Sequence, residues 1–140
     1  MPSKTTLKRA RKDKREGKAA STQAGEFVRE EMDHIREGKH GARSTKQAIA
    51  IGLSKARRAG VDLAPPKKGT TSPATRKKAK RDLERGRKGA GKKTSAKRSA
   101  ATKKALKREP HAAASHSALS KQAKKAASAR KRRGKVTSSR

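Results

Sequence analysis

Four histidines are the side chains of this sequence best suited to binding a metal ion. His34 and His40 lie on either side of a glycine, and His111 and His116 lie much further along the chain. The sequence has no cysteine, so disulfides and thiolate metal ligands are excluded. We therefore expect four solvated surface histidines, with no bound metal and no cofactor.

Carboxylates gather on one short stretch near the first two histidines. Glu30, Glu31, Asp33 and Glu37 are the candidates for general acid and base chemistry. Such chemistry needs an enclosing pocket, and a chain of 140 residues with one aromatic residue has few large apolar side chains to build one. We expect these acids to be solvated or paired along a helix face, and we expect no enzyme activity.

One glycine-rich segment, GRKGAGKK from Gly86 to Lys93, nearly matches the phosphate-binding loop pattern G-x-x-x-x-G-K-[ST]. That loop requires a preceding strand and a hydroxyl side chain at its last position, where magnesium binds. Here Lys93 takes the hydroxyl position, and the preceding RDLER is not typical of a strand. The segment is expected to be a linker.

Positive charge dominates the whole chain. The sequence has 43 Lys and Arg against 11 Asp and Glu, a formal net charge of +32. Repulsion of this size opposes compaction unless a polyanion neutralises it. Nucleic acid is the first candidate, because duplex DNA carries about one negative charge per 1.7 Å. An anionic membrane surface is the second.

Neither a membrane span nor a signal peptide is expected from the sequence. No apolar run reaches the roughly 18 residues that a span requires. The basic residues at the N-terminus are not followed by the apolar segment of a signal peptide. We expect the protein to stay in the compartment where it is made.

Residues 21–63 carry the pattern of a helical hairpin. In the first helix Val28, Met32 and Ile35 recur with the 3.6-residue period, and Phe27 flanks them. In the second helix Ile49 and Leu53 form a matching stripe. Two antiparallel helices packed through these stripes would be small and marginally stable, so a second copy of the chain is a candidate partner for residues 21–63.

The helix ends of this hairpin have recognisable signals. Ser21 or Thr22 is the expected cap of the first helix, and Gly38 suits the left-handed position after its end. Ser44 and Gln47 have the spacing of a capping box. The second helix should end before Gly60.

The remainder of the chain is expected to contain little stable structure. Residues 1–20 form a basic arm, with a short helix around Thr6 to Glu16 in which Leu7 and Ala10 are the apolar contacts. Residues 64–140 hold 27 Lys and Arg against 3 Asp and Glu, a net charge of +24. Their apolar residues larger than alanine, too few to offset the entropy of ordering, are Leu83, Leu106, Leu119 and Val136.

The predicted fold class is thus a small all-α helical hairpin followed by a long, mostly disordered basic tail. Within the tail, residues 74–85, 99–108 and 117–133 are rich in good helix formers. Like charges repel within such helices, so we expect phosphates to favour them by neutralisation.

An internal echo links the hairpin to the tail. Lys46-Gln47-Ala48 followed by Arg57-Arg58 matches Lys121-Gln122-Ala123 followed by Arg132-Arg133 at an offset of 75 residues. The later copy has lysines where the earlier copy has Ile49 and Ala50, so it looks like the second helix without its core. Duplication and chance in a biased composition both explain the match.

The segment GKHGARSTKQAIAIGLSKARRAG, from Gly38 to Gly60, resembles a family of short basic bacterial proteins that is known as a domain of unknown function. The resemblance covers roughly residues 20–63 and implies a bacterial accessory protein without assigning an activity. The tail is separately similar in composition to the lysine- and alanine-rich tails of linker-histone-like (histone H1-like) bacterial proteins.

Composition and resemblance together favour a protein that binds nucleic acid without sequence specificity, DNA ahead of RNA. It would act as a histone-like, nucleoid-associated protein of the bacterial cytoplasm. The alternatives are an RNA- or ribosome-associated structural protein and an adaptor on an anionic membrane surface. The residues expected to contact phosphate are Lys39, Arg43, Ser44, Lys46, Arg57, Arg58, Lys77, Lys78, Lys92, Lys93, Lys103, Lys104, Lys124, Lys125, Arg130, Lys131, Arg132 and Arg133.

The turn before the second helix is the most specific of these predicted sites. Free backbone N–H groups at a helix N-terminus attract anions. Lys39, Arg43 and Lys46 surround this terminus, and Gly41 would let the backbone approach a phosphate closely. The alternative is a plain capped helix whose bases offset the acidic first helix.

Overall fold

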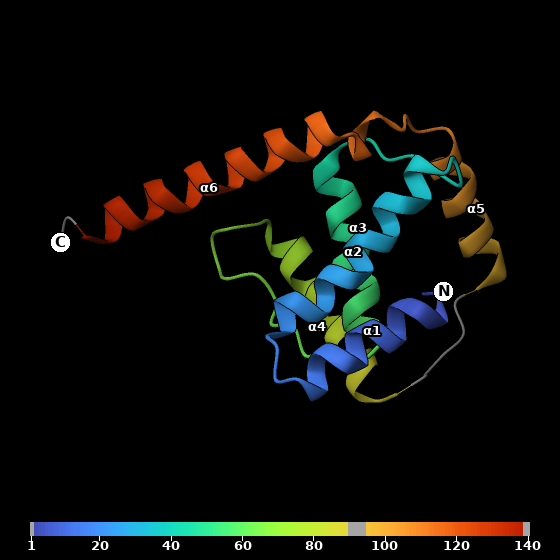
Figure 1. Cartoon of the computed structure of the whole chain (residues 1–140), viewed down its shortest axis with the longest axis horizontal. Helices are drawn as coiled ribbons and strands as arrows, with labels where there is room; N and C mark the ends of the chain where they lie inside the picture. Colours follow the sequence, from blue (N-terminus) through green and yellow to red (C-terminus); the bar gives the residue numbers. More distant parts are fainter. Residues whose placement is uncertain (1, 90–94, 139–140) are drawn as a thin grey trace.

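In the computed structural model, which describes residues 2–89 and 95–138 and side chains as far as residue 132, every regular element is a helix. Figure 1 shows a compact group of helices from which the last helix projects. In chain order the helices are α1 (Lys4–Arg15), α2 (Ala20–Arg36), α3 (Thr45–Arg58), α4 (Pro73–Arg87), α5 (Ala96–Lys107), the short 3-10 helix η1 (Ala112–Ala114) and α6 (His116–Ser138). None of the described helices combines the length and apolar character needed to cross a bilayer.

Helices α2 and α3 pack against each other in the region for which a helical hairpin, residues 21–63, was predicted. Gly38 and Gly60 follow the two helix ends with φ of 80° and 102°, the left-handed conformation that favours glycine. Ser44 caps α3 by accepting a hydrogen bond from the backbone N–H of Gln47. The prediction that Ser21 or Thr22 caps α2 is wrong. The helix begins one residue earlier, at Ala20, and no side chain caps it.

Apolar side chains form one cluster at each end of this antiparallel pair. At the end nearest the α2–α3 turn, Met32 and Ile35 pack with small residues and with Leu119 of α6. At the other end, Phe27 is 1% exposed and packs with Ala10 and Leu7 of α1. The basic arm therefore docks through the two apolar contacts expected of it.

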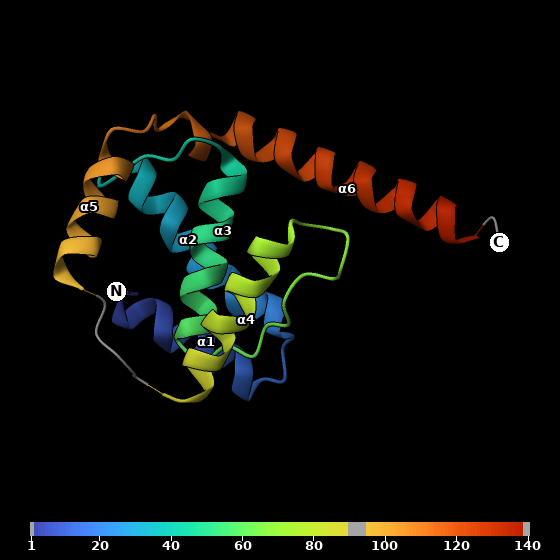
Figure 2. The same ribbon diagram turned by 180° about the vertical axis from the view of Figure 1, so that it is seen from behind.

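The disordered tail predicted for residues 64–140 is wrong over most of its length. The three stretches selected by helix propensity form α4, α5 and α6. In α4, Ala79 and Leu83 are buried, and this helix packs against α3 (Figure 2). After α5, the buried Ala113 and Ala114 of η1 complete the cluster at the turn end.

Buried alanines explain why helices beyond the hairpin pack against it. The prediction counted only apolar residues larger than alanine, yet Ala42, Ala48 and Ala114 are each 0% exposed. Small side chains let backbones approach closely, so contact is made with little apolar volume. The hairpin stripe that a second copy was expected to cover is covered by α1, η1 and Leu119 of the same chain.

Gly52 marks the closest approach within the hairpin. A Cβ atom at this position would lie 2.7 Å from the Cα atom of Val28 on α2. We expect Gly52→Ala to lower the free energy of unfolding by roughly 1–3 kcal/mol, because overpacking outweighs the gain in helix propensity. Gly25→Ala is the matched control, since a Cβ atom there meets nothing within 4 Å. It should raise stability by up to about 1 kcal/mol. Urea unfolding followed by circular dichroism measures both, and a stabilised Gly52→Ala protein would contradict this packing.

Candidate nucleic-acid interface

Helix α6 projects from the helical body as a single rod (Figure 1). Its 23 residues correspond to a length of about 34 Å at the rise of an α-helix. Only its beginning is anchored, through η1, α3 and the half-buried Leu119. From residue 123 to residue 132 its side chains are exposed, apart from the half-buried Ala126 and Ala129. The rod is therefore open to a partner between residues 123 and 132.

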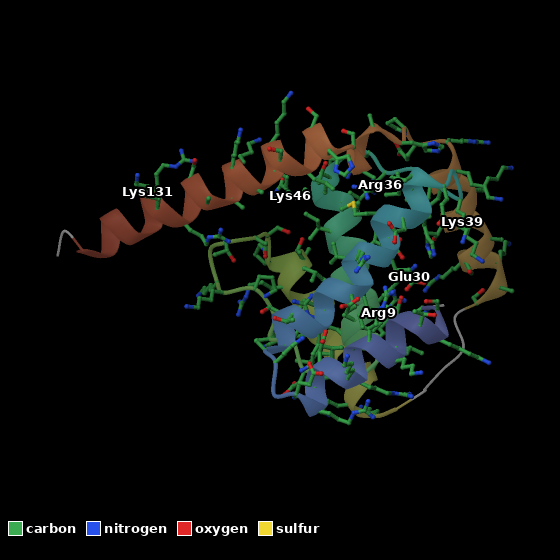
Figure 3. All side chains as sticks on the ribbon, viewed as in Figure 1. Arg9, Glu30, Arg36, Lys39, Lys46 and Lys131 are labelled. Atoms are coloured by element: carbon green, nitrogen blue, oxygen red, sulfur yellow. The ribbon has the colours of Figure 1, made fainter. Side chains whose placement is uncertain are left out.

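Five basic side chains share one face of α6. Their spacing of 3, 4, 10 and 11 residues from the first places them within a sector of about 120° on a helix with 100° per residue. All five are exposed, and Figure 3 shows Lys131 pointing into solvent. These residues, called the α6 basic face below, are Lys121, Lys124, Lys125, Lys131 and Arg132.

No ion pair among the described residues involves this face. The chain contains no Asp or Glu after Glu109, and α5 has none either. Among the described residues, the ion pairs involve bases before α5 only, such as Arg87 with Asp62 and Lys39 with Glu37. Unpaired cations of one sign on a rigid helix repel one another, and a polyanion relieves that repulsion.

An open groove of about 380 Å³ joins the start of α3 to α6. Ser44, Thr45 and Lys46 line one side, and Lys121 and Lys125 line the other. The first residues of the two matching segments, at Lys46 and at Lys121, thus line the same groove. Lys121 was missing from the predicted site, although the four-residue spacing to Lys125 would have placed both on one helix face.

The predicted phosphate site in the α2–α3 turn is only partly available. Gly41 does approach another group closely, but that group is the backbone of Glu109 and Pro110. Its N–H donates to the carbonyl of Leu106, and the Thr45 hydroxyl donates to the carbonyl of Ala113. The predicted close approach of a phosphate to Gly41 is therefore wrong, because the backbone there is packed against the chain itself.

Arg57 also has a structural position. It is 6% exposed, and its guanidinium donates to the carbonyls of Leu63 and Ala64. Burial lowers the pKa of this guanidinium, and the Asp82 carboxylate opposes that shift. Arg57 thus fixes the segment after α3 and is left out of the candidate interface.

The other predicted contact residues fall into three groups. Lys39 and Arg58 are exposed but face carboxylates, of Glu37 at 3.3 Å and of Asp82 at 4.0 Å. A second group is exposed but lies outside the α6 basic face, on other helices, in the α2–α3 turn or on the far side of α6. Its members are Arg43, Lys46, Lys77, Lys78, Lys103, Lys104 and Arg130. Lys92 and Lys93 lie outside the described residues, and the side chain of Arg133 is outside them as well.

The expectation of four solvated histidines is wrong for two of them. The side chains of His34 and His40 are 21% and 14% exposed, and both lie against Glu31, which is 1% exposed. His111 and His116 are exposed as expected. The spacing of Glu31 and His34, one helical turn apart, was the signal in the sequence for this cluster.

The part of the chain around the hairpin is similar to a known sequence family. A search of curated proteins and a search of solved structures each found no match. Residues 3–68, which include α1, α2, α3 and the segment after them, match the model of a family of unknown function, DUF6496.

Proposed function

We propose that this protein binds double-stranded DNA through its phosphate backbone, without sequence specificity, and that α6 is the principal contact. The helical body anchors the start of α6 and adds the exposed bases of α4 and α5. In a bacterial cell, such a protein would be associated with the nucleoid.

The observation that carries this proposal is the α6 basic face. It combines exposed cations on one side of a helix, the lack of any acidic residue after Glu109, and an orientation that projects away from the body. A disordered tail of the same composition would neutralise phosphates at a larger entropic cost, because binding would also order it. The preformed helix avoids part of that cost.

Helix dimensions favour duplex DNA over duplex RNA. An α-helix with side chains is about 10–12 Å across, and the major groove of B-DNA is about 12 Å wide. The major groove of A-form RNA is deep and too narrow for side chains to read. The length of α6, about 34 Å, is close to one turn of B-DNA.

Single strands are disfavoured for a different reason. Proteins that bind them commonly stack bases on aromatic side chains. The single aromatic residue of this chain, Phe27, is buried between α1, α2 and α3. Contacts must therefore be made to the backbone, which a duplex presents as two rows of phosphates.

Competition between nucleic acids tests this proposal with the full chain. We expect 24-base-pair duplexes of three unrelated sequences to bind with affinities within about 10-fold, because phosphate contacts carry no sequence information. Duplex RNA of equal length and anionic vesicles should bind more weakly. A preference of more than about 1000-fold for one sequence, the scale of specific recognition, would contradict the proposal. Tighter binding to RNA or to vesicles would favour one of the alternative partners instead.

A further inference from the structure

A buried carboxylate lies between two histidines next to the α2–α3 turn. Glu31 of α2 is 1% exposed. The Nε2 atom of His40 lies 3.0 Å from its Oε2 atom, and the Nδ1 atom of His34 lies 4.0 Å from its Oε1 atom. The three side chains offer ligand atoms that all lie within 4.8 Å of one another.

The second ring nitrogen of His40 fixes its tautomer. Nδ1 lies 2.9 Å from the carbonyl oxygen of Gly41. A carbonyl oxygen only accepts hydrogen bonds, so Nδ1 carries the proton and donates it. In the neutral ring, the lone pair of Nε2 then faces Glu31.

His34 has a similar arrangement with a carboxylate in place of the carbonyl. Its Nε2 atom lies 3.5 Å from Oε1 of Glu30, one helical turn earlier. A proton on Nε2 would face that carboxylate and leave the Nδ1 lone pair directed at Glu31. In its neutral form each histidine would therefore have an acceptor beside one nitrogen and a lone pair on the other, as in histidines that bind metals.

In their neutral forms the two imidazoles direct lone pairs at the Glu31 carboxylate, and a bound metal cation would stabilise that arrangement. We propose that Glu31, His34 and His40 bind a divalent transition-metal ion, with Zn²⁺ as the best match. Zinc at about 2.0–2.1 Å from each ligand in tetrahedral geometry would separate the ligand atoms by roughly 3.3 Å. The Oε2 atom of Glu31 lies 3.0 Å from Nε2 of His40, close to that value, and the ligand atoms of the three side chains all lie within 4.8 Å of one another. Two histidines and one carboxylate leave a fourth position for water.

Lys55 of α3 neutralises part of this site without blocking it. Its ammonium group donates to Oε1 of Glu31, whereas Oε2 is the oxygen that faces His40. A carboxylate can bind a metal through one oxygen and accept a hydrogen bond with the other. Lys55 therefore supports a monodentate Glu31.

One of the three proposed ligands, His34, lies at a groove that is open to solvent. A groove of about 230 Å³ between α1 and α2 is lined by Glu30 and His34. Figure 3 shows Glu30 on α2 near Arg9 of α1, which lines the same groove. The groove is also lined by the acidic Glu26, Asp33 and Glu37 and by the basic Arg9, Arg29 and Lys39.

Zinc titration of the full chain without nucleic acid tests this site independently of DNA binding. We expect one Zn²⁺ to bind per chain by calorimetry, and Co²⁺ to give the visible absorption of a tetrahedral centre. In proton NMR spectra of the wild-type protein, Zn²⁺ should shift the ring signals of His34 and His40 and leave those of His111 and His116 in place. This last readout needs no variant.

Variants provide the quantitative comparison. His34→Ala and His40→Ala should each weaken zinc binding by more than about 100-fold, since changes outside the ligand set already cost 10- to 100-fold. The matched control is His111→Asn with His116→Asn, both exposed, which should leave the affinity within about 2-fold. The proposal is overturned if the wild-type protein shows no saturable zinc binding, or if zinc shifts only the His111 and His116 signals. Equal affinity of a folded His40→Ala protein would overturn it as well.

Discussion

Neutralising the α6 basic face is expected to weaken binding to duplex DNA by about 10³- to 10⁴-fold at 0.1 M salt. Each cation that contacts a phosphate releases a counterion, so the loss of five contacts removes a large part of the electrostatic free energy. Glutamine has a helix propensity close to that of lysine and arginine, so α6 should remain helical. Fluorescence anisotropy with a 24-base-pair duplex measures the affinity. The substitutions are Lys121→Gln, Lys124→Gln, Lys125→Gln, Lys131→Gln and Arg132→Gln.

A charge-matched variant on α1 separates position from net charge. It also removes five positive charges, at exposed residues that form no ion pair among the described residues. We expect it to lose less than about 10-fold in affinity, because these residues lie on the helical body rather than on α6. Equal losses in the two variants would show that charge acts without regard to place, contrary to the proposal. The control substitutions are Lys4→Gln, Lys8→Gln, Arg9→Gln, Arg11→Gln and Lys14→Gln.

Phe27→Ala is expected to lower the free energy of unfolding by about 3–5 kcal/mol. Phe27 is the largest side chain in the cluster that joins α1 to the hairpin. The other buried residues of this cluster include Ala10, Ala24 and Ala56. Small neighbours cannot fill the cavity, and the loss is comparable to the whole stability of a marginal domain. Urea unfolding at 222 nm provides the measurement.

Phe27→Leu is the companion variant for this prediction. It keeps an apolar side chain and removes less volume, so it should lose clearly less stability than Phe27→Ala. A loss below about 1 kcal/mol for Phe27→Ala would contradict the packing of α1 against the hairpin.

The hairpin was predictable because its residues carry strong local signals. Met32 and Ile35 repeat with the helical period, and Gly38 and Gly60 take the positive φ that their positions suggested. The cap at Ser44 follows from its own hydroxyl and the nearby N–H of Gln47. Such contacts lie within a few residues, so the sequence contains them directly.

The position of the later helices was not predictable in the same way. Ala113 and Ala114 are buried only because the chain returns to Ile35 and Ala42 after about 70 residues. No local pattern distinguishes these alanines from the exposed alanines of α5. Their helix propensity was readable from the sequence, whereas their burial depends on long-range packing.

The candidate sites likewise combine features that the local sequence shows with features that only the fold shows. Four of the five residues of the α6 basic face could be named from charge alone, but Lys121 was missed, and only the fold shows that none of the five forms an ion pair with a described residue. The histidines of the cluster of Glu31, His34 and His40 were interpreted as surface residues, because the helical spacing pairs Glu31 with His34 only and does not show that the turn brings His40 to Glu31. Arg57 was wrongly predicted to contact phosphate. Its guanidinium is buried and donates to two carbonyls of the segment after α3, which the local sequence does not show.

The salt dependence of DNA binding tests the central claim most directly. For the wild-type protein, a plot of log K against log salt concentration should have a slope of about −5 or steeper. Neutralising the α6 basic face should make that slope shallower by about 4.5, or 0.9 for each phosphate contact. A wild-type slope near −1, or a slope that is unchanged when the α6 basic face is neutralised, would contradict the account.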